Sequence, residues 1–166
     1  MEAVNKLQIS RLVKITSIIV LGTLLLAISA KIQIHLFPVP MTMQTFVVLF
    51  LGMAFGYKIG LATVSLYLFE GLIGIPVFAK GGGLIYFTGP TAGYLIGFLF
   101  SVFFAGYLKL KSDPMFIFLK LIFSVSFIYF FGLIWLGFYG SWEKSLIELI
   151  NLGAKPFLLA ETYKIL

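Results

Sequence analysis

Long runs of residues without charge divide this chain and constrain its fold more than any other feature. The first run, Ile15 to Ala30, holds sixteen uncharged residues between Lys14 and Lys31. As a helix it nearly spans a hydrocarbon core of about 30 Å. Of all 166 residues, 61% are hydrophobic and 11% are charged, whereas soluble domains are about half apolar and about a quarter charged. We therefore exclude a water-soluble globular protein and predict an all-α membrane protein.

Several function classes are disfavoured by what the sequence lacks. The net charge is +6, but the basic residues stand singly between apolar runs, which is typical of loops that flank membrane spans rather than of a nucleic-acid surface. The absence of cysteine rules out disulfides and thiolate metal sites. The single histidine, His35, has no neighbouring carboxylate, so no metal site is expected. No phosphate-binding P-loop and no catalytic pair is recognised, so we predict neither an ATPase nor any other enzyme, and no cofactor.

Glycines, prolines and charges divide the chain into apolar helices within one membrane-embedded domain, residues 1–166. The expected helices cover residues 15–30, 43–57, 59–69, 90–108, 115–138 and 156–166. Pro38 and Pro40 interrupt helical structure before the second, which Thr42 can cap. Pro90 is expected at the first position of the fourth helix. The last helix reaches only about 16 Å by helix rise and is expected to be incomplete.

The segments between these helices fall into four kinds. A tight turn is expected at residues 56–58, and Lys109, Lys111, Asp113 and Pro114 predict a polar turn. Residues 70–89 carry Gly81-Gly82-Gly83 and lack periodicity, so we predict an irregular outer loop that acts as a lid. A capping box from Ser145 to Glu148 predicts a short amphipathic helix at the membrane interface.

Small residues recur every fourth position in two of the predicted helices. They are Gly52, Gly56 and Gly60 in one, and Gly93, Gly97, Ser101 and Ala105 in the other. Such stripes allow close approach of helix backbones in lipid. We interpret them as packing surfaces within the chain, with docking of another membrane subunit as the alternative.

The distribution of Lys and Arg predicts which way the chain crosses the membrane. Seven of the counted basic residues fall on one side and four on the other when the N-terminus is cytoplasmic, which favours that orientation. The proline-containing loop and the glycine-rich loop then face outward together with the start of the last helix. Irregular and polar features that meet on one face indicate a ligand site there.

Two ionisable residues stand in the last apolar helix, Glu161 and Lys164, three positions apart and therefore on one helix face. Ionisable groups at membrane depth are costly, and they usually serve function. A polar site for a small charged ligand is one interpretation, and a simple ion pair near the interface is the other.

Several motifs resemble the BioY family, the biotin-specific substrate-binding subunits of energy-coupling factor transporters. They are Val39-Pro40-Met41-Thr42-Met43-Gln44-Thr45, Gly71-Leu72-Ile73-Gly74-Ile75-Pro76-Val77-Phe78 followed by Gly82-Gly83, the run from Gly89 to Phe98, and Pro156-Phe157 with Glu161 and Lys164. Their order is the family's order, and together they extend over nearly the whole chain.

The resemblance implies a compact bundle of six transmembrane helices in the cell membrane with cytoplasmic termini, and biotin held near the outer surface. It also implies two kinds of partner, a transmembrane coupling subunit and two ABC-type ATPases, in addition to membrane lipid. Three features depart from the family. Glu161 stands where an aspartate is usual, Leu95 replaces an arginine of some relatives, and only two residues follow Lys164.

A biotin site needs apolar walls, an acceptor for the ureido N–H groups and a cation or donor for the charged end. We hypothesise that Glu161 and Lys164 supply the charged contacts. The other candidate ligand-binding residues are Thr91 and Tyr94 nearby, Phe78, Tyr86 and Phe87 as wall and lid, Gly82 and Gly83 in the loop, and Gln44 from the second helix. Two alternatives stay open, a substrate subunit for another vitamin and a small ligand-free membrane pore or structural protein.

Overall fold

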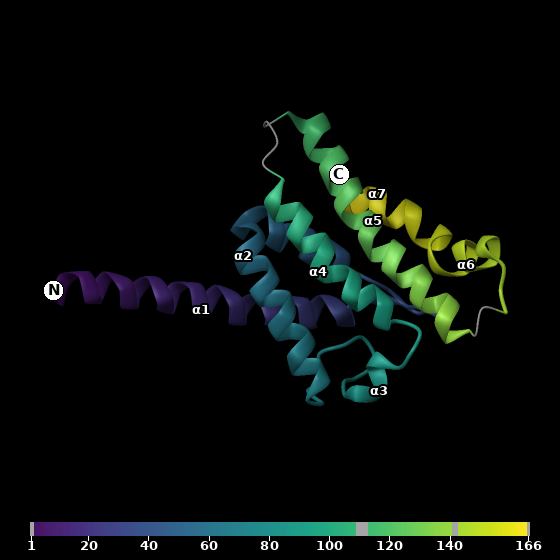
Figure 1. The fold of residues 1–166 in the computed structure, drawn as a ribbon, viewed down its shortest axis with the longest axis horizontal. Helices are drawn as coiled ribbons and strands as arrows, with labels where there is room; N and C mark the ends of the chain where they lie inside the picture. Colours follow the sequence, from purple (N-terminus) through teal and green to yellow (C-terminus); the bar gives the residue numbers. More distant parts are fainter. Residues whose placement is uncertain (1, 109–112, 141–142, 166) are drawn as a thin grey trace.

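The computed structural model describes residues 2–108, 113–140 and 143–165, and these residues are mostly helical. Four long helices form the body of the molecule (Figure 1): α1 (Glu2–Lys31), α2 (Gln44–Leu72), α4 (Ala92–Tyr107) and α5 (Pro114–Tyr139). Within the described residues, Gln8–Lys31, α2 and α5 are long and apolar enough to cross a membrane. The predicted class, an α-helical membrane protein, is confirmed at this level.

Helix α2 is broken at Gly56, whose backbone has φ +78° and ψ 168°. Only glycine adopts this region readily. The turn predicted at residues 56–58 is therefore present as a break between two shorter helical stretches. The first stretch begins at Gln44, as predicted, although Met43 rather than Thr42 occupies the capping position. The second stretch continues to Leu72, beyond the predicted end at residue 69.

The start of α4 differs from the prediction that Pro90 is its first residue. The helix begins at Ala92, with Thr91 as its cap. Pro90 lies instead in the preceding turn, where the Ala92 N–H donates to the Gly89 carbonyl over 3.3 Å. Proline is favoured at the second position of such a turn, because its fixed φ suits that position. The same Gly89 carbonyl also accepts from the Trp135 indole N–H of α5 over 2.8 Å.

Helix α4 packs between α2 and α5, and small residues permit both contacts. A Cβ atom on Gly52 or Gly60 of α2 would meet Val102 of α4, and one on Gly97 would lie 2.6 Å from the Ile128 Cα of α5. The interpretation of the small-residue stripes as packing surfaces is confirmed at these positions. Gly56 is the exception, because its role is the backbone break rather than a close contact.

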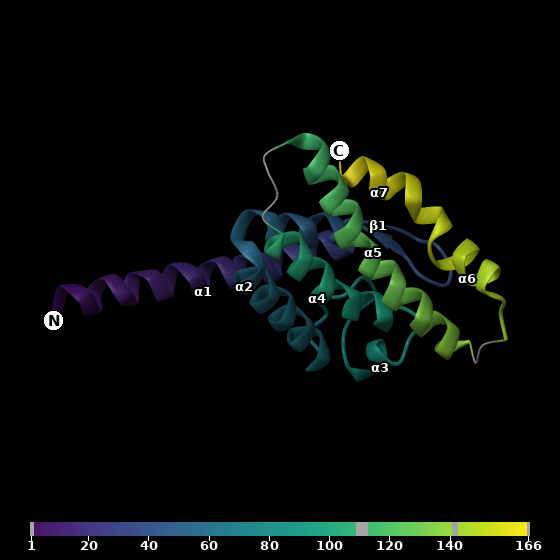
Figure 2. The same ribbon diagram turned by 45° about the horizontal axis from the view of Figure 1, so that its top comes forward.

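Helix α1 packs mainly against α2, and its N-terminal part projects beyond the other helices in both views (Figures 1 and 2). A two-stranded hairpin, β1 (Gln33–Ile34) with β2 (Met41–Thr42), follows α1 and was not predicted. The irregular loop predicted at residues 70–89 is present from residue 73, because residues 70–72 belong to α2, and it contains the short helix α3 (Leu84–Phe87).

The chain then returns to the bundle through three short helices. They are α6 (Leu146–Gly153), the 3₁₀ turn η1 (Lys155–Phe157) and α7 (Leu158–Ile165). The predicted capping box is confirmed, since the Ser145 and Glu148 side chains each bond the other's backbone N–H. Of the predicted polar turn, Lys109 and Lys111 lie outside the described residues. The side chain of Asp113 caps α5 by accepting from the Met115 N–H over 2.9 Å.

Candidate functional site

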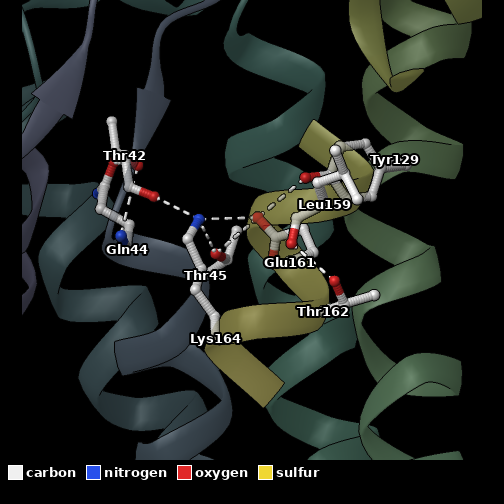
Figure 3. Close-up of polar contacts among 8 residues, drawn as sticks. All are labelled: Thr42, Gln44, Thr45, Tyr129, Leu159, Glu161, Thr162 and Lys164. Carbon is white, nitrogen blue, oxygen red and sulfur yellow. Dashed lines mark hydrogen bonds and ion pairs between the residues drawn. The ribbon is translucent and has the colours of Figure 1, made fainter. Parts of the chain in front are cut away.

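The ion pair predicted from spacing lies on α7, against the first turn of α2. The Lys164 ammonium is 2.8 Å from Glu161 Oε1, and the two side chains are 8% and 5% exposed. Figure 3 shows that Lys164 Nζ also points at two further acceptors, the Thr42 carbonyl of β2 at 2.7 Å and Thr45 Oγ1 of α2 at 2.9 Å. An ammonium has three N–H donors, so every donor of Lys164 has a partner inside the protein.

The Glu161 carboxylate is held asymmetrically (Figure 3). Its Oε1 accepts from Lys164, from Thr45 Oγ1 at 3.0 Å and from the Tyr129 hydroxyl of α5, also at 3.0 Å. Its Oε2 is buried and accepts no hydrogen bond from any residue that the structure describes. Leaving a buried acceptor unpaired costs about 1–3 kcal/mol. The arrangement therefore presents one fixed, charged acceptor that is ready for a donor.

A cavity lies beside this carboxylate, among α2, α4, α5, α7 and the irregular loop. It holds about 520 Å³ of empty space, its open mouth included, and Glu161 is one of its lining residues. Small-molecule sites commonly have mostly apolar walls and a few polar groups. The apolar walls are formed by Val39, Pro40, Phe78, Leu95, Phe98, Ile128 and Phe157. The cavity thus combines an apolar enclosure with one anionic acceptor.

Six of the ten predicted site residues line this cavity: Gln44, Phe78, Tyr86, Thr91, Tyr94 and Glu161. Lys164 is not among the lining residues, but it donates hydrogen bonds to three residues that are: Thr42, Thr45 and Glu161. Phe87 does not line the cavity either, but its ring packs against that of Phe78, with ring centroids 5.6 Å apart. Gly82 and Gly83 are also absent from the lining, and the Gly83 N–H instead donates to the Gly71 carbonyl over 2.6 Å.

The aromatic residues on the loop side of the cavity are held by burial and by neighbouring backbone. Desolvation raises the pKa of the Tyr86 hydroxyl above its ordinary value, so this group remains a neutral phenol at physiological pH. The Tyr94 hydroxyl donates to the Gly153 carbonyl over 2.8 Å. This bond joins α4 to the end of α6 and orients one face of the cavity.

Sequence reasoning missed two polar residues that hold the carboxylate, Thr45 and Tyr129. Thr45 lies within the first of the motifs and directly follows Gln44, a predicted site residue. Its position in the motif could therefore have indicated a role in the site. Tyr129 lies in the middle of the apolar helix α5, among aromatic residues of similar size. Nothing in its spacing sets it apart from a residue that packs in the core.

The chain is similar in sequence to known proteins. A sequence model of the BioY family matches residues 3–166. The chain is 34% identical over 152 residues to a probable biotin transporter BioY of Pyrococcus horikoshii, covering 91% of this chain and 89% of that one. It is 35% identical over 146 residues to the biotin transporter BioY of Thermotoga maritima, covering 86% and 84%.

A solved structure gives the same result for the fold. The chain is similar to the crystal structure of the S-component for biotin from an ECF-type ABC transporter, with a TM-score of 0.82 and 29% sequence identity. The similarity covers 94% of this chain and 87% of that one. The family match, residues 3–166, includes α7 with its buried ion pair. This chain belongs to the BioY family.

Proposed function

We propose that this chain captures biotin at the outer face of the cell membrane, as the substrate-binding (S) component of an ECF-type ABC transporter. The observation that carries the proposal is the unpaired, buried Oε2 of Glu161, the only acidic residue among the described residues that line the cavity. The names of the similar proteins, biotin transporters and a biotin S-component, support the choice of ligand.

The chemistry of biotin fits the distribution of polar groups in the cavity. A ureido ring carries N–H donors, and a carboxylate oxygen without a partner accepts such a donor in a charge-assisted hydrogen bond. Phe78, Leu95, Phe98 and Phe157 offer apolar surface for the thioether ring and the aliphatic chain. The ureido group supplies a donor to Glu161 Oε2, which accepts no hydrogen bond from the described residues.

Charge repulsion fixes the orientation of the ligand in this proposal. The valerate carboxylate of biotin has the same charge as Glu161, and like charges repel strongly where little water intervenes. Among the described residues that line the cavity, none is cationic. Biotin therefore binds with its ureido end at Glu161 and its carboxylate toward the open mouth.

Lys164 acts on the ligand indirectly in this proposal. Its three donors are taken by Thr42, Thr45 and Glu161, so it fixes the carboxylate and compensates its charge. Without such a partner the buried carboxylate would be an uncompensated charge, which is strongly destabilising. The predicted charged pair thus divides into a ligand acceptor and its positioning residue.

Membership of the family supports the wider context of the proposal. The chain acts as one domain of six membrane helices, α2 counting as two because of its break at Gly56, with a cytoplasmic N-terminus. Its partners are a transmembrane coupling subunit and two ABC-type ATPases, which supply the ATP hydrolysis for which this sequence has no P-loop. It has no enzymatic activity of its own.

The test is equilibrium binding of biotin to the purified chain in detergent, with thiamine and riboflavin as control ligands. Selective biotin binding that is weakened by Glu161→Gln supports the proposal. Glu70→Gln is the matched control, because Glu70 accepts a hydrogen bond from Thr23 over 3.1 Å and does not line the cavity. Equal affinity for all three vitamins, or biotin binding unaffected by Glu161→Gln, would overturn it.

A further inference from the structure

Three successive carbonyl groups of the irregular loop each accept a hydrogen bond from a different part of the fold. The Val77 carbonyl accepts from the Tyr67 hydroxyl of α2 over 3.1 Å. The Phe78 carbonyl accepts from the Lys31 ammonium at the end of α1 over 2.6 Å. The Ala79 carbonyl accepts from the Gln33 side-chain amide of β1 over 3.2 Å.

These bonds fix a segment that forms part of the cavity wall. Phe78 and Ala79 both line the cavity, and Phe78 is only 1% exposed. The Phe78 ring packs against Tyr67 with centroids 5.4 Å apart and against Tyr86 at 4.6 Å. The same three bonds that hold the loop backbone therefore set where the Phe78 ring stands in the site.

The backbone on either side of the fixed segment is suited to movement. Gly74 has φ +100° and Gly83 has φ +97°, and at neither position would a Cβ atom meet a described neighbour within 4 Å. Glycine passes between such conformations and ordinary ones at little cost. Hinge positions are commonly a few loop residues that absorb a change of φ and ψ.

The Tyr67 hydroxyl also connects the loop to the polar side of the cavity. It accepts from the Gln44 side-chain amide over 2.6 Å while it donates to Val77. Gln44 is itself a lining residue and accepts from the Thr42 hydroxyl over 3.2 Å. Thr42 in turn provides the backbone carbonyl that holds Lys164. A continuous set of hydrogen bonds thus extends from the Glu161–Lys164 pair to the loop.

We propose that Lys31, Gln33 and Tyr67 form a clip that holds the loop around Phe78 against the cavity and thereby sets the rates of ligand entry and release. The inference rests on the proposed function, because the ligand is the one assigned above. Lys31 is the positioning residue best suited to a test. Its ammonium bonds the loop backbone, Lys31 does not line the cavity, and its side chain is exposed, so its replacement leaves the packed core intact.

The first experiment measures opening of the loop without any ligand. The chain contains no cysteine, so Ala79→Cys provides a single labelling position, and Ala79 is only 8% exposed. Its modification by a water-soluble maleimide requires the loop to move outward. Adding Lys31→Met to the Ala79→Cys variant should accelerate labelling about fivefold, because a fivefold change in the open population corresponds to the loss of one hydrogen bond. Added Lys31→Arg should restore slow labelling, because a guanidinium can donate to the same carbonyl.

Lys80→Met is the matched control for the labelling, since it removes the same charge from the neighbouring loop position. Lys80 is exposed, and among the described residues its ammonium has no hydrogen-bond partner. Labelling of Ala79→Cys should be unaffected by this change. Equal rates with Lys31→Met and with the unaltered lysine, or equal acceleration by Lys80→Met, would overturn the clip.

The second experiment measures biotin release from the chain without the cysteine. Lys31→Met should raise koff about fivefold, with recovery in Lys31→Arg and no effect of Lys80→Met. An unchanged koff in Lys31→Met would overturn the inference even if its thermal stability fell. Failure of the unaltered chain to bind biotin would instead remove the proposed function, while the labelling result would still decide whether the clip exists.

Discussion

Replacement of Lys164 by methionine tests the central contact of the site most directly. The change keeps most of the side-chain length but removes three hydrogen bonds of 2.7, 2.8 and 2.9 Å, to Thr42, Glu161 and Thr45. Both charged side chains are less than a tenth exposed, so Glu161 would lose its compensating charge. Breaking a buried pair in this way typically costs about 3–5 kcal/mol of stability.

The expected effect of Lys164→Met on ligand binding is a loss of at least about 1.5 kcal/mol, or roughly tenfold in Kd. Isothermal titration with biotin in detergent measures it, and a melting curve of the same sample establishes that the variant is folded. Lys155→Met is the control, because Lys155 is an exposed lysine just before α7. It should bind biotin as the unaltered chain does.

A double-mutant cycle with Glu161→Gln separates an indirect role of Lys164 from a direct one. If Lys164 acts through the carboxylate, adding Lys164→Met to Glu161→Gln costs little further affinity, and the coupling energy is about 1 kcal/mol or more. Additive losses would refute the reasoning that Lys164 positions Glu161. Binding within twofold of the unaltered chain in Lys164→Met would refute the involvement of the pair altogether.

Three further changes follow from the packing and from the carboxylate. Gly97→Ala places a Cβ 2.6 Å from the Ile128 Cα, so it should lower stability by about 1–3 kcal/mol in a detergent unfolding titration. Gly140→Ala is the control, because its Cβ meets nothing closer than 3.4 Å, and it should leave the stability unchanged. Gly56→Ala should cost about 1–3 kcal/mol in the same titration through its backbone conformation alone. Tyr129→Phe removes one donor to Glu161 Oε1 and should weaken biotin binding about fivefold in a binding titration.

Each of these expectations has an outcome that would contradict it. Equal stability of Gly97→Ala and Gly140→Ala would mean that α4 and α5 do not approach as closely as described. An unaltered unfolding midpoint in Gly56→Ala would show that a side chain is tolerated at the break in α2. Biotin affinity that is unchanged in Tyr129→Phe would remove the α5 hydroxyl from the support of the carboxylate.

Helix positions could be predicted because apolar length and glycine or proline breaks act locally. The break at Gly56 and the capping box at Ser145 are set by a few adjacent residues, so their signals are complete within the sequence. The hairpin of β1 and β2 has no such signal, since each strand has two residues and its register depends on the partner. The start of α4 was placed too early because Pro90 suits both a helix start and a turn.

The polar core of the site was only partly predictable for a different reason. Glu161 and Lys164 are conspicuous because charge is rare in apolar helices. Thr45 and Tyr129 become important only through contacts with residues 116 and 32 positions away. Aromatic and hydroxyl side chains are common in membrane helices, so composition does not separate these two from packing residues. Tertiary contact alone gives them a role.

The spacing of the site along the chain has a consequence for biosynthesis. Lys164 reaches partners 119 and 122 residues earlier in the sequence, Thr45 in the first turn of α2 and Thr42 in β2 just before it. During synthesis, the segment that begins α2 must therefore enter the membrane well before the segment that completes the binding site exists. Biotin cannot assist insertion of the earlier helices. A ligand that binds only the finished arrangement stabilises it by mass action. Biotin would therefore stabilise the packing of α7 against helices that are already in the bilayer.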